Sequence, residues 1–126
     1  MKGPTVTAST LERVRPWLMA AAEWGNEGLT WPLIREGIAA GDYHLLHNAT
    51  AAVLLEPYAQ DDGRLVICVL LAGGDLEGVT PLLQQAEEIA RHNNCSKITA
   101  VARPGWRAFA HRIGYRMEAV HYSKDL

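Results

Sequence analysis

The residues of this sequence that could carry out chemistry are mostly charged side chains in its second half, and they are unevenly distributed. Residues 65–90 contain no Lys or Arg. The carboxylates of that stretch are Asp75, Glu77, Glu87 and Glu88. From Arg91 onward the sign reverses, because seven basic residues stand against only Glu118 and Asp125. An acidic stretch therefore precedes a basic final third, and the two would attract different ligands.

The histidines and cysteines form no recognisable metal or nucleophile motif. His44 and His47 are three residues apart, which puts them on opposite faces of a strand. His92 and Cys95 flank the end of a predicted helix without two further ligands, and Cys68 lies inside an apolar run. The sequence also contains no Gly-x-Ser-x-Gly elbow and no Walker-type Gly-Lys-Ser/Thr loop. We therefore expect no metal site, two structural thiols, and neither a hydrolase nor a nucleotidase.

Length and composition describe an ordinary globular protein. The 126 residues are 48% hydrophobic and 21% charged, with 12 Lys+Arg against 14 Asp+Glu. This length predicts a single domain, residues 1–126, and the net charge of −2 does not favour a nucleic-acid binder. The longest apolar run, residues 65–74, is too short to span a membrane, and the amino terminus lacks the apolar block of a secretory signal. We expect a cytoplasmic protein that does not enter membranes.

Hydrophobic periodicity predicts nine elements around these residues. Apolar residues at spacings of three and four predict helices, alternation predicts strands, and the unbroken apolar run predicts a central strand buried on both faces. The predicted helices cover residues 11–24, 31–40, 76–93 and 106–113. The predicted strands cover residues 42–48, 51–55, 64–72, 97–102 and 115–123. The resulting order is ααβββαβαβ.

This order predicts an α/β fold with a mixed central sheet and helices on both faces. The early strands form antiparallel hairpins, whereas residues 64–102 form a strand-helix-strand unit with the length of a right-handed parallel crossover. We expect the long helix 76–93 on one face of the sheet and the helix 106–113 on the other. A ligand would bind where the parallel strands part, near residues 70–79.

The second half of the chain resembles the GNAT superfamily of acyl-CoA N-acyltransferases. The resemblance rests on Leu82–Arg91 (LLQQAEEIAR), Lys97–Val101 (KITAV), Trp106–Phe109 (WRAF) and Ile113–Arg116 (IGYR). It implies a V-shaped parting of two strands, into which acetyl-CoA inserts its pantetheine arm. It also implies that backbone N–H groups at the start of the long helix hold the diphosphate. The candidate cofactor-binding residues are Leu71, Ala72, Gly73, Gly74, Gly78, Val79 and Arg107.

A narrower resemblance connects the chain with the small GNAT-like proteins of tailed bacteriophages. It rests on Leu70–Gly74 (LLAGG), Arg103–Trp106 (RPGW) and Val120–Leu126 (VHYSKDL). This likeness implies a role in or near the virion, so a protein partner such as a virion protein is expected. Homo-oligomerisation is left open.

The sequence departs from the superfamily pattern at the diphosphate loop and at the acid position. Asp75 and Glu77 would face the diphosphate where the family has a cation and glycine, at a cost of about 1–3 kcal/mol for each like-charge contact. Asp75 has a second explanation as the cap of the long helix. The Tyr that often protonates the departing thiolate is replaced by Ala110. Alternative proton-transfer groups are His111, Tyr43, His44 and His47, and none of them stands out.

These departures favour a degenerate acyl-CoA site. The leading hypothesis is a pseudoenzyme that binds no cofactor and acts as a binding or virion-associated component, through its tryptophan-bearing helices or its arginines. Trp17 and Trp24 are core residues or partner contacts, and exposure distinguishes the two. The alternative is an acetyl-CoA-dependent N-acetyltransferase with an atypical loop, in which Arg103 or Arg107 reaches the diphosphate. An open gap beyond Leu71 would favour the enzyme.

Overall fold

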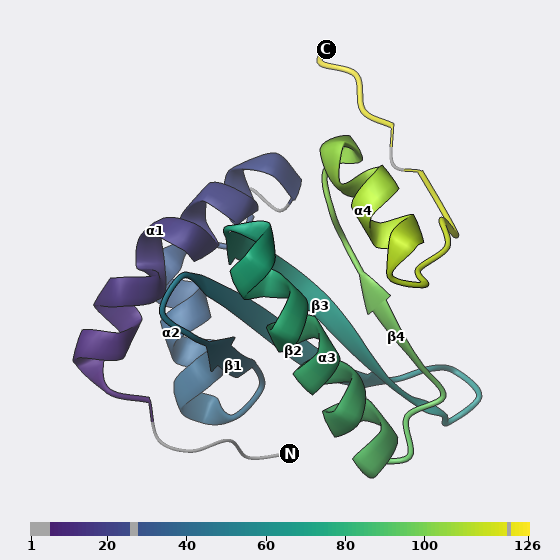
Figure 1. The fold of residues 1–126 in the computed structure, drawn as a ribbon, viewed down its shortest axis with the longest axis horizontal. Helices are drawn as coiled ribbons and strands as arrows, with labels where there is room; N and C mark the ends of the chain where they lie inside the picture. Colours follow the sequence, from purple (N-terminus) through teal and green to yellow (C-terminus); the bar gives the residue numbers. More distant parts are fainter. Residues whose placement is uncertain (1–5, 26–27, 121) are drawn as a thin grey trace.

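The computed structural model describes residues 6–25, 28–120 and 122–126, and it contains four α-helices and four strands within them (Figure 1). Two helices come first, followed by three strands, a long helix, a short strand and a last short helix. Their bounds are α1 Ala8–Gly25, α2 Trp31–Ala40, β1 His44–His47, β2 Ala51–Ala59, β3 Leu65–Gly74, α3 Leu76–His92, β4 Lys97–Ala100 and α4 Arg107–Arg112. A 3₁₀ turn, Pro104–Trp106, leads into α4.

The strands form one mixed sheet in the order β1-β2-β3-β4. The pairs β1–β2 and β2–β3 are antiparallel, and β3–β4 is parallel through the α3 crossover. Pro57 lies in β2 opposite Ile67 of β3, and the part of β2 that pairs with β1 ends at Leu55. The side of Pro57 that lacks an N–H therefore faces no strand of the described sheet. The predicted mixed sheet is confirmed.

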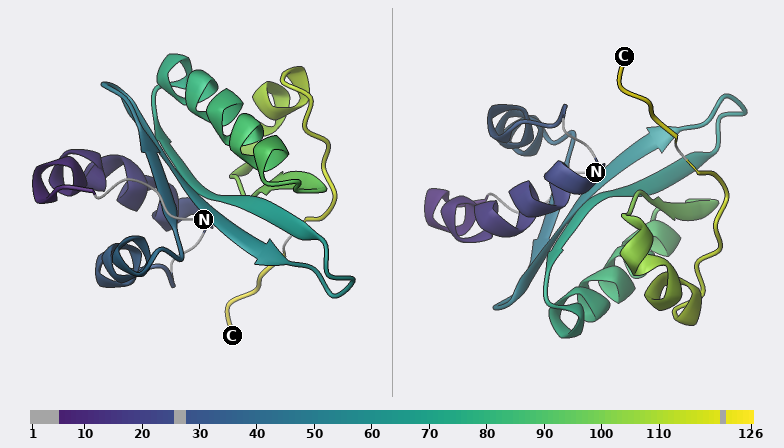
Figure 2. Two further views of the ribbon diagram at one scale, coloured as in Figure 1. Left: turned by 90° about the horizontal axis from the view of Figure 1, so that it is seen from below. Right: turned by 90° about the horizontal axis from the view of Figure 1, so that it is seen from above.

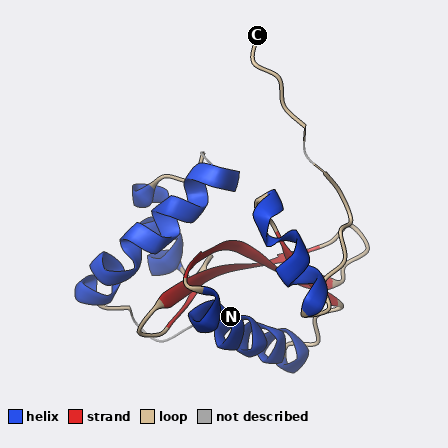
Figure 3. Ribbon diagram, turned by 45° about the horizontal axis from the view of Figure 1, so that its top comes forward, coloured by secondary structure: helices blue, strands red, loops and turns tan. Residues whose placement is uncertain are grey.

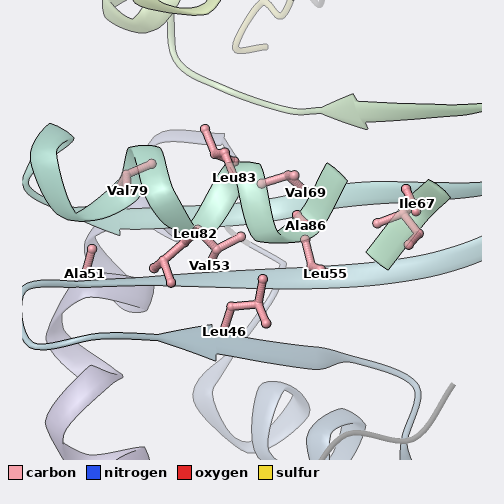
Figure 4. Packing of buried hydrophobic residues seen from close by; sticks show 11 residues of the cluster. Leu46, Ala51, Val53, Leu55, Ile67, Val69, Val79, Leu82, Leu83 and Ala86 are labelled. Carbon is pink, nitrogen blue, oxygen red and sulfur yellow. The ribbon is translucent and has the colours of Figure 1, made fainter. Parts of the chain in front are cut away.

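Two apolar clusters cover the two faces of the sheet. On one face α1 and α2 bring Val14, Leu18 and Ile34 against Leu54. On the other face α3 packs its own apolar stripe over the sheet (Figure 4). The residues of this second face are Leu46, Ala51, Val53, Leu55, Ile67, Val69, Val79, Leu82, Leu83, Ala86 and Ala90. The two end-on views show the sheet with one helix pair on each side (Figure 2).

The last helix lies on a different face from the one predicted. Trp106, Phe109 and Ile113 pack against the cluster that α3 covers, so α4 shares the α3 face. The spacing of these residues defines an apolar side of the helix but does not say which face of the sheet it covers. The handedness rule settles the position of α3, because α3 joins two parallel strands; no described strand follows α4.

The predicted final strand, residues 115–123, is wrong. Residues 115–120 and 122–123 have no regular structure and run as an extended loop (Figure 3). Glu118 forms ion pairs with Lys97 of β4 at 3.3 Å and with Arg116 at 3.7 Å. Met117 and Tyr122 are exposed. The alternation of this segment predicts a strand only if a neighbouring strand pairs with it, and in the described part of the chain none does.

A β-bulge in β3 sets the direction of the residues around the site. The register shifts so that Leu55 pairs with Val69 and Leu54 with Leu71, which leaves Leu70 as the extra residue. Val69 therefore points into the α3 face, whereas Leu71, two residues later, points into the α1 face. Without the bulge both side chains would lie on the same face, since side chains of a strand alternate.

Candidate functional site

The site begins where β3 and β4 part. Their pairing extends to Val69 and Ala100, and the carbonyl oxygen of Val69 accepts the last bond, 3.2 Å from the Val101 nitrogen. β3 continues five residues beyond this pair, to Gly74, while β4 ends. A gap therefore opens between the carboxyl ends of two neighbouring parallel strands, which is the place predicted from the sequence.

The backbone of β3 faces this gap with unpaired polar groups. The backbone groups of successive residues in a strand point in turn toward one neighbouring strand and then the other. Before the bulge, the N–H and C=O groups of Val69 and of every second residue preceding it point toward β4, and those of the residues between them point toward β2. Leu70 shifts this alternation by one residue. Ala72 and Gly74 therefore direct their N–H and C=O groups toward the gap, while β2 pairs with the residues between them. These two residues present a short free strand edge.

A cavity of about 350 Å³ occupies the gap. Its walls come from both faces of the sheet: Pro16, Trp17, Ala20, Ala21 and Trp24 of α1 on one side, and Leu83, Trp106, Phe109, Ala110, Ile113 and Tyr115 on the other. The ends of the two strands, residues 69–74 and 100–103, form the remaining lining. The cavity therefore connects the two faces of the sheet through the parting of β3 and β4.

The lining is apolar and rich in aromatic rings, and it contains one charged residue, Arg103. The guanidinium carbon of Arg103 lies 5.3 Å from the ring centroid of Trp24, and Trp24 as a residue is 66% exposed. On the opposite wall Trp106 and Phe109 form an edge-to-face pair with centroids 5.6 Å apart. Trp24 thus lies on the α1 wall of the cavity and is partly open to solvent, and Trp106 lies on the opposite wall.

The start of α3 is already capped by the chain itself. The Asp75 carboxylate accepts hydrogen bonds from the Gly78 N–H at 2.7 Å and from the Thr50 hydroxyl at 2.9 Å. Asn48 donates to the Gly78 carbonyl at 2.8 Å. The predicted capping role of Asp75 is confirmed. One N–H group that could contact a diphosphate is therefore already bonded to a carboxylate.

The structure brings together some of the predicted cofactor-binding residues and separates others. Leu71, Ala72, Gly73 and Gly74 line the cavity. Gly78 and Val79 do not line it: Gly78 is held by the cap, and Val79 is fully buried in the core beneath α3. Arg107 is exposed on the first turn of α4 and does not line the cavity either. The cation at the cavity is Arg103.

Two glycines in this wall allow close approach of neighbouring backbone. A Cβ on Gly73 would lie 2.2 Å from the Trp17 carbonyl oxygen, so α1 rests directly on β3 here. Gly74 has φ of +107°, and a Cβ there would lie 2.2 Å from the Thr50 carbonyl oxygen. Because glycine has no Cβ, α1 and the β1–β2 turn can pack directly against the end of β3 at these two positions.

Tyr115 is the residue whose role the sequence did not predict. It lines the cavity beside Ala110, and its hydroxyl oxygen is buried without a hydrogen-bond partner among the described residues. Burial, followed by the Glu87 carboxylate, raises the pKa of Tyr115 to about 12. The family resemblance places a proton donor at position 110, whereas the phenol that lines this cavity is Tyr115, which directly follows Gly114 after α4.

The other candidate proton-transfer residues lie outside the cavity lining. His111 is exposed on α4. His47 faces Arg13, whose guanidinium lies 2.6 Å from the ring Nδ1; burial and then this charge lower the pKa of His47. Tyr43 packs against Gly37. Burial also lowers the pKa of His44, whose Nδ1 is buried and unpartnered. None of these groups faces the gap.

Across residues 6–25, 28–120 and 122–126, no three His, Cys, Asp or Glu side chains gather in a way that could hold a metal ion. Cys68 and Cys95 are free thiols, and burial raises the pKa of both. None of the described helices is both long and apolar enough to cross a membrane.

Solved structures with the same fold include proteins named as acetyltransferases and one named as a transcriptional regulator. A probable acetyltransferase superimposes with a TM-score of 0.72 at 13% identity, over 96% of this chain and 95% of that one. The ribosomal-protein-alanine N-acetyltransferase of Brucella melitensis biovar Abortus 2308 gives 0.69 at 12%, over 96% of both chains. A transcriptional regulator from Bacillus halodurans C-125 gives 0.68 at 14%, over 98% and 97%. No protein-family model and no curated protein matches the sequence.

The chain therefore has the α/β fold of the GNAT acetyltransferases. Identities of 12–14% make this a statement about fold alone. The matched proteins include a regulator as well as enzymes, so their names assign no activity to this chain.

Proposed function

We propose that the chain is an acyl-CoA-dependent N-acyltransferase, in which a thioester donor and an amine acceptor meet in the gap between β3 and β4. The observation that carries this proposal is the cavity, because it passes between the faces of the sheet beside a free strand edge at Ala72 and Gly74. The sequence alone favours a non-catalytic protein. An open gap beyond Leu71 is the feature that favours the enzyme instead.

The free edge of β3 suits an extended donor arm that carries amide groups. The N–H and C=O groups of Ala72 and Gly74 point into the gap, and an extended chain with its own amides can pair with the Ala72 C=O and the Gly74 N–H as an added strand would, which leaves the Ala72 N–H free. Apolar side chains on both sides exclude water from such an arm. Acetyl-CoA supplies a pantetheine arm with two amides and a reactive thioester at its end.

The chain's own groups can assist the transfer without a carboxylate base. The Ala72 N–H can donate to the acyl oxygen as negative charge develops there. The apolar lining disfavours an ammonium ion, so an amine in the cavity is held in its neutral, nucleophilic form and releases its proton to water. Tyr115 remains protonated at neutral pH, and its unpartnered hydroxyl can give a proton to the departing thiolate.

Calorimetric titration with acetyl-CoA, combined with an assay for released thiol, tests this proposal. Ala110 lines the cavity and Ala108 is exposed on the same helix outside it. Ala110→Phe should therefore fill the gap and reduce acetyl-CoA affinity at least tenfold, while Ala108→Phe should leave it unchanged. Equal affinities for both variants would place the donor elsewhere and refute the proposal.

The second candidate function is the non-catalytic one, a binding component that includes the virion-associated role implied by the phage resemblance. The acidic start of α3 favours it, since Asp75 takes the Gly78 N–H and Glu77 adds a second negative charge in the first helical turn. This candidate predicts no acetyl-CoA binding up to millimolar concentration. Micromolar affinity would exclude it.

A further inference from the structure

The α1 side of the cavity combines two indoles with one guanidinium. Trp17 and Trp24 are seven residues apart on α1, so they lie on the same side of that helix, and both line the cavity. Ala20 and Ala21 between them leave room beside the rings. Arg103 reaches this wall from the loop after β4 and lies over Trp24. This wall of Trp17, Trp24 and Arg103 is called the indole–arginine wall below.

The charge of the indole–arginine wall is not neutralised by the chain. Among the described residues Arg103 forms no ion pair, and no Asp or Glu lines the cavity. A guanidinium beside an apolar cavity binds a carboxylate through two parallel hydrogen bonds. The same guanidinium repels an ammonium ion. The cavity lining contains no carboxylate that could pair with such an ion. The wall therefore suits a ligand with an anionic end and an apolar body.

The proposed donor and an acceptor would enter the cavity from opposite faces of the sheet. The start of α3, the carboxyl end of β3 and Tyr115 belong to the part of the site that faces the proposed donor. The indole–arginine wall lies on the α1 face of the sheet, on the other side of the gap. An acceptor entering from that side would reach the thioester through the gap between the strands.

We propose that the acceptor is an apolar or aromatic α-amino acid, whose carboxylate binds Arg103 and whose side chain packs on Trp17 and Trp24. This inference rests on the proposed acyltransferase function and names its substrate class. In the transfer a bond forms between the amine nitrogen and the acyl carbon, and the carbon–sulfur bond breaks. The thiolate leaves with the bonding electron pair and takes up one proton, and the amine releases one proton to water.

Three amines separate the contributions of the carboxylate and of the ring. L-phenylalanine has both groups, phenethylamine lacks the carboxylate, and L-alanine lacks the ring. With acetyl-CoA as donor, kcat/KM for L-phenylalanine should exceed that for each of the other two at least tenfold. A preference for phenethylamine, or equal rates for all three amines, would overturn the proposal.

Substitution of the guanidinium gives a test that a merely structural role would not satisfy. Arg103→Gln should lower kcat/KM for L-phenylalanine at least tenfold, through KM, and leave phenethylamine within twofold; Arg103→Lys should restore part of the loss. Arg91→Gln removes the same charge from the exposed end of α3, outside the cavity lining, and should change neither amine. Equal losses for both amines with Arg103→Gln would overturn the role of Arg103.

Two binding measurements distinguish failure of this inference from failure of the proposed function. Acetyl-CoA is titrated alone by calorimetry, and L-phenylalanine is titrated alone by following the tryptophan side-chain N–H signals in NMR spectra. Donor binding without any shift of Trp17 or Trp24 by L-phenylalanine would overturn the acceptor class and leave the acyltransferase standing. Absence of donor binding would overturn both.

Discussion

Replacement of Asp75 by Asn separates the two roles that this residue has at the start of α3. The Asp75 carboxylate caps the helix through Gly78 and Thr50, at 2.7 and 2.9 Å. Asn retains an oxygen that can accept the same bond and is an equally good capping residue. The substitution removes one negative charge from the place where a diphosphate would lie. Asp75→Asn should therefore leave the fold intact and improve acetyl-CoA binding.

The size of the gain follows from Coulomb's law. One unit charge about 8 Å from a diphosphate with about two charges contributes roughly 1 kcal/mol at the high effective dielectric of an exposed site, after screening by salt. Acetyl-CoA affinity should then rise about fivefold in Asp75→Asn. Glu77→Gln removes a neighbouring charge that does not cap the helix and should give a similar gain. Both gains should shrink at high salt.

Calorimetry and thermal melting together check the reasoning. Asp75→Ala removes the charge and the cap together, so it should gain affinity but lose about 1 kcal/mol of folding free energy, or about 4 °C in Tm. Unchanged acetyl-CoA affinity in both Asp75→Asn and Glu77→Gln would refute the placement of the diphosphate at the start of α3.

Three further variants test particular contacts. Gly73→Ala should destabilise the fold by about 1–3 kcal/mol in chemical denaturation, because its Cβ would meet the Trp17 carbonyl oxygen; an unchanged midpoint would contradict this packing. Tyr115→Phe should slow acyl transfer about 100-fold with little change in acetyl-CoA affinity. Because the pKa of Tyr115 is raised from 10.0 to about 12, wild type should also lose stability relative to Tyr115→Phe as pH rises through this interval; parallel melting profiles would refute it. Arg13→Ala should raise the pKa of His47 in an NMR titration, since the Arg13 charge helps to lower it.

Local sequence signals predicted most of the elements. The apolar run at residues 65–71 identified the central strand. The predicted helix 31–40 matches α2, which Thr30 and Gly41 cap at its two ends. α1 begins at Ala8, three residues before the predicted start at residue 11, and the Thr7 hydroxyl accepts a hydrogen bond from the Thr10 N–H at 3.2 Å. Adjacent Ser and Thr residues are chemically equivalent caps, so the sequence does not choose between them.

The features that define the site depend on contacts between distant residues. The bulge at Leu70 arises from the pairing of β3 with β2 and has no local signal such as a glycine. It decides that Ala72 and Gly74 face the gap. The position of α4 and the absence of a strand at residues 115–120 likewise depend on neighbours that a sequence pattern does not contain. The sequence therefore located the parting of the strands and the β3 side of its lining, Leu71 to Gly74, but not the contributions of α1, α4 and Tyr115.

The most direct test of the acyltransferase proposal is an NMR titration of the backbone amides with acetyl-CoA. The signals of Ala72 and Gly74, whose N–H groups face the gap, should shift together with those of residues 101–103 across it, with saturation at micromolar to submillimolar concentration. Amides on the opposite edge of the sheet, in β1, should stay in place. No shift at millimolar acetyl-CoA, or shifts confined to residues outside the gap, would contradict the proposal that this cavity holds an acyl donor.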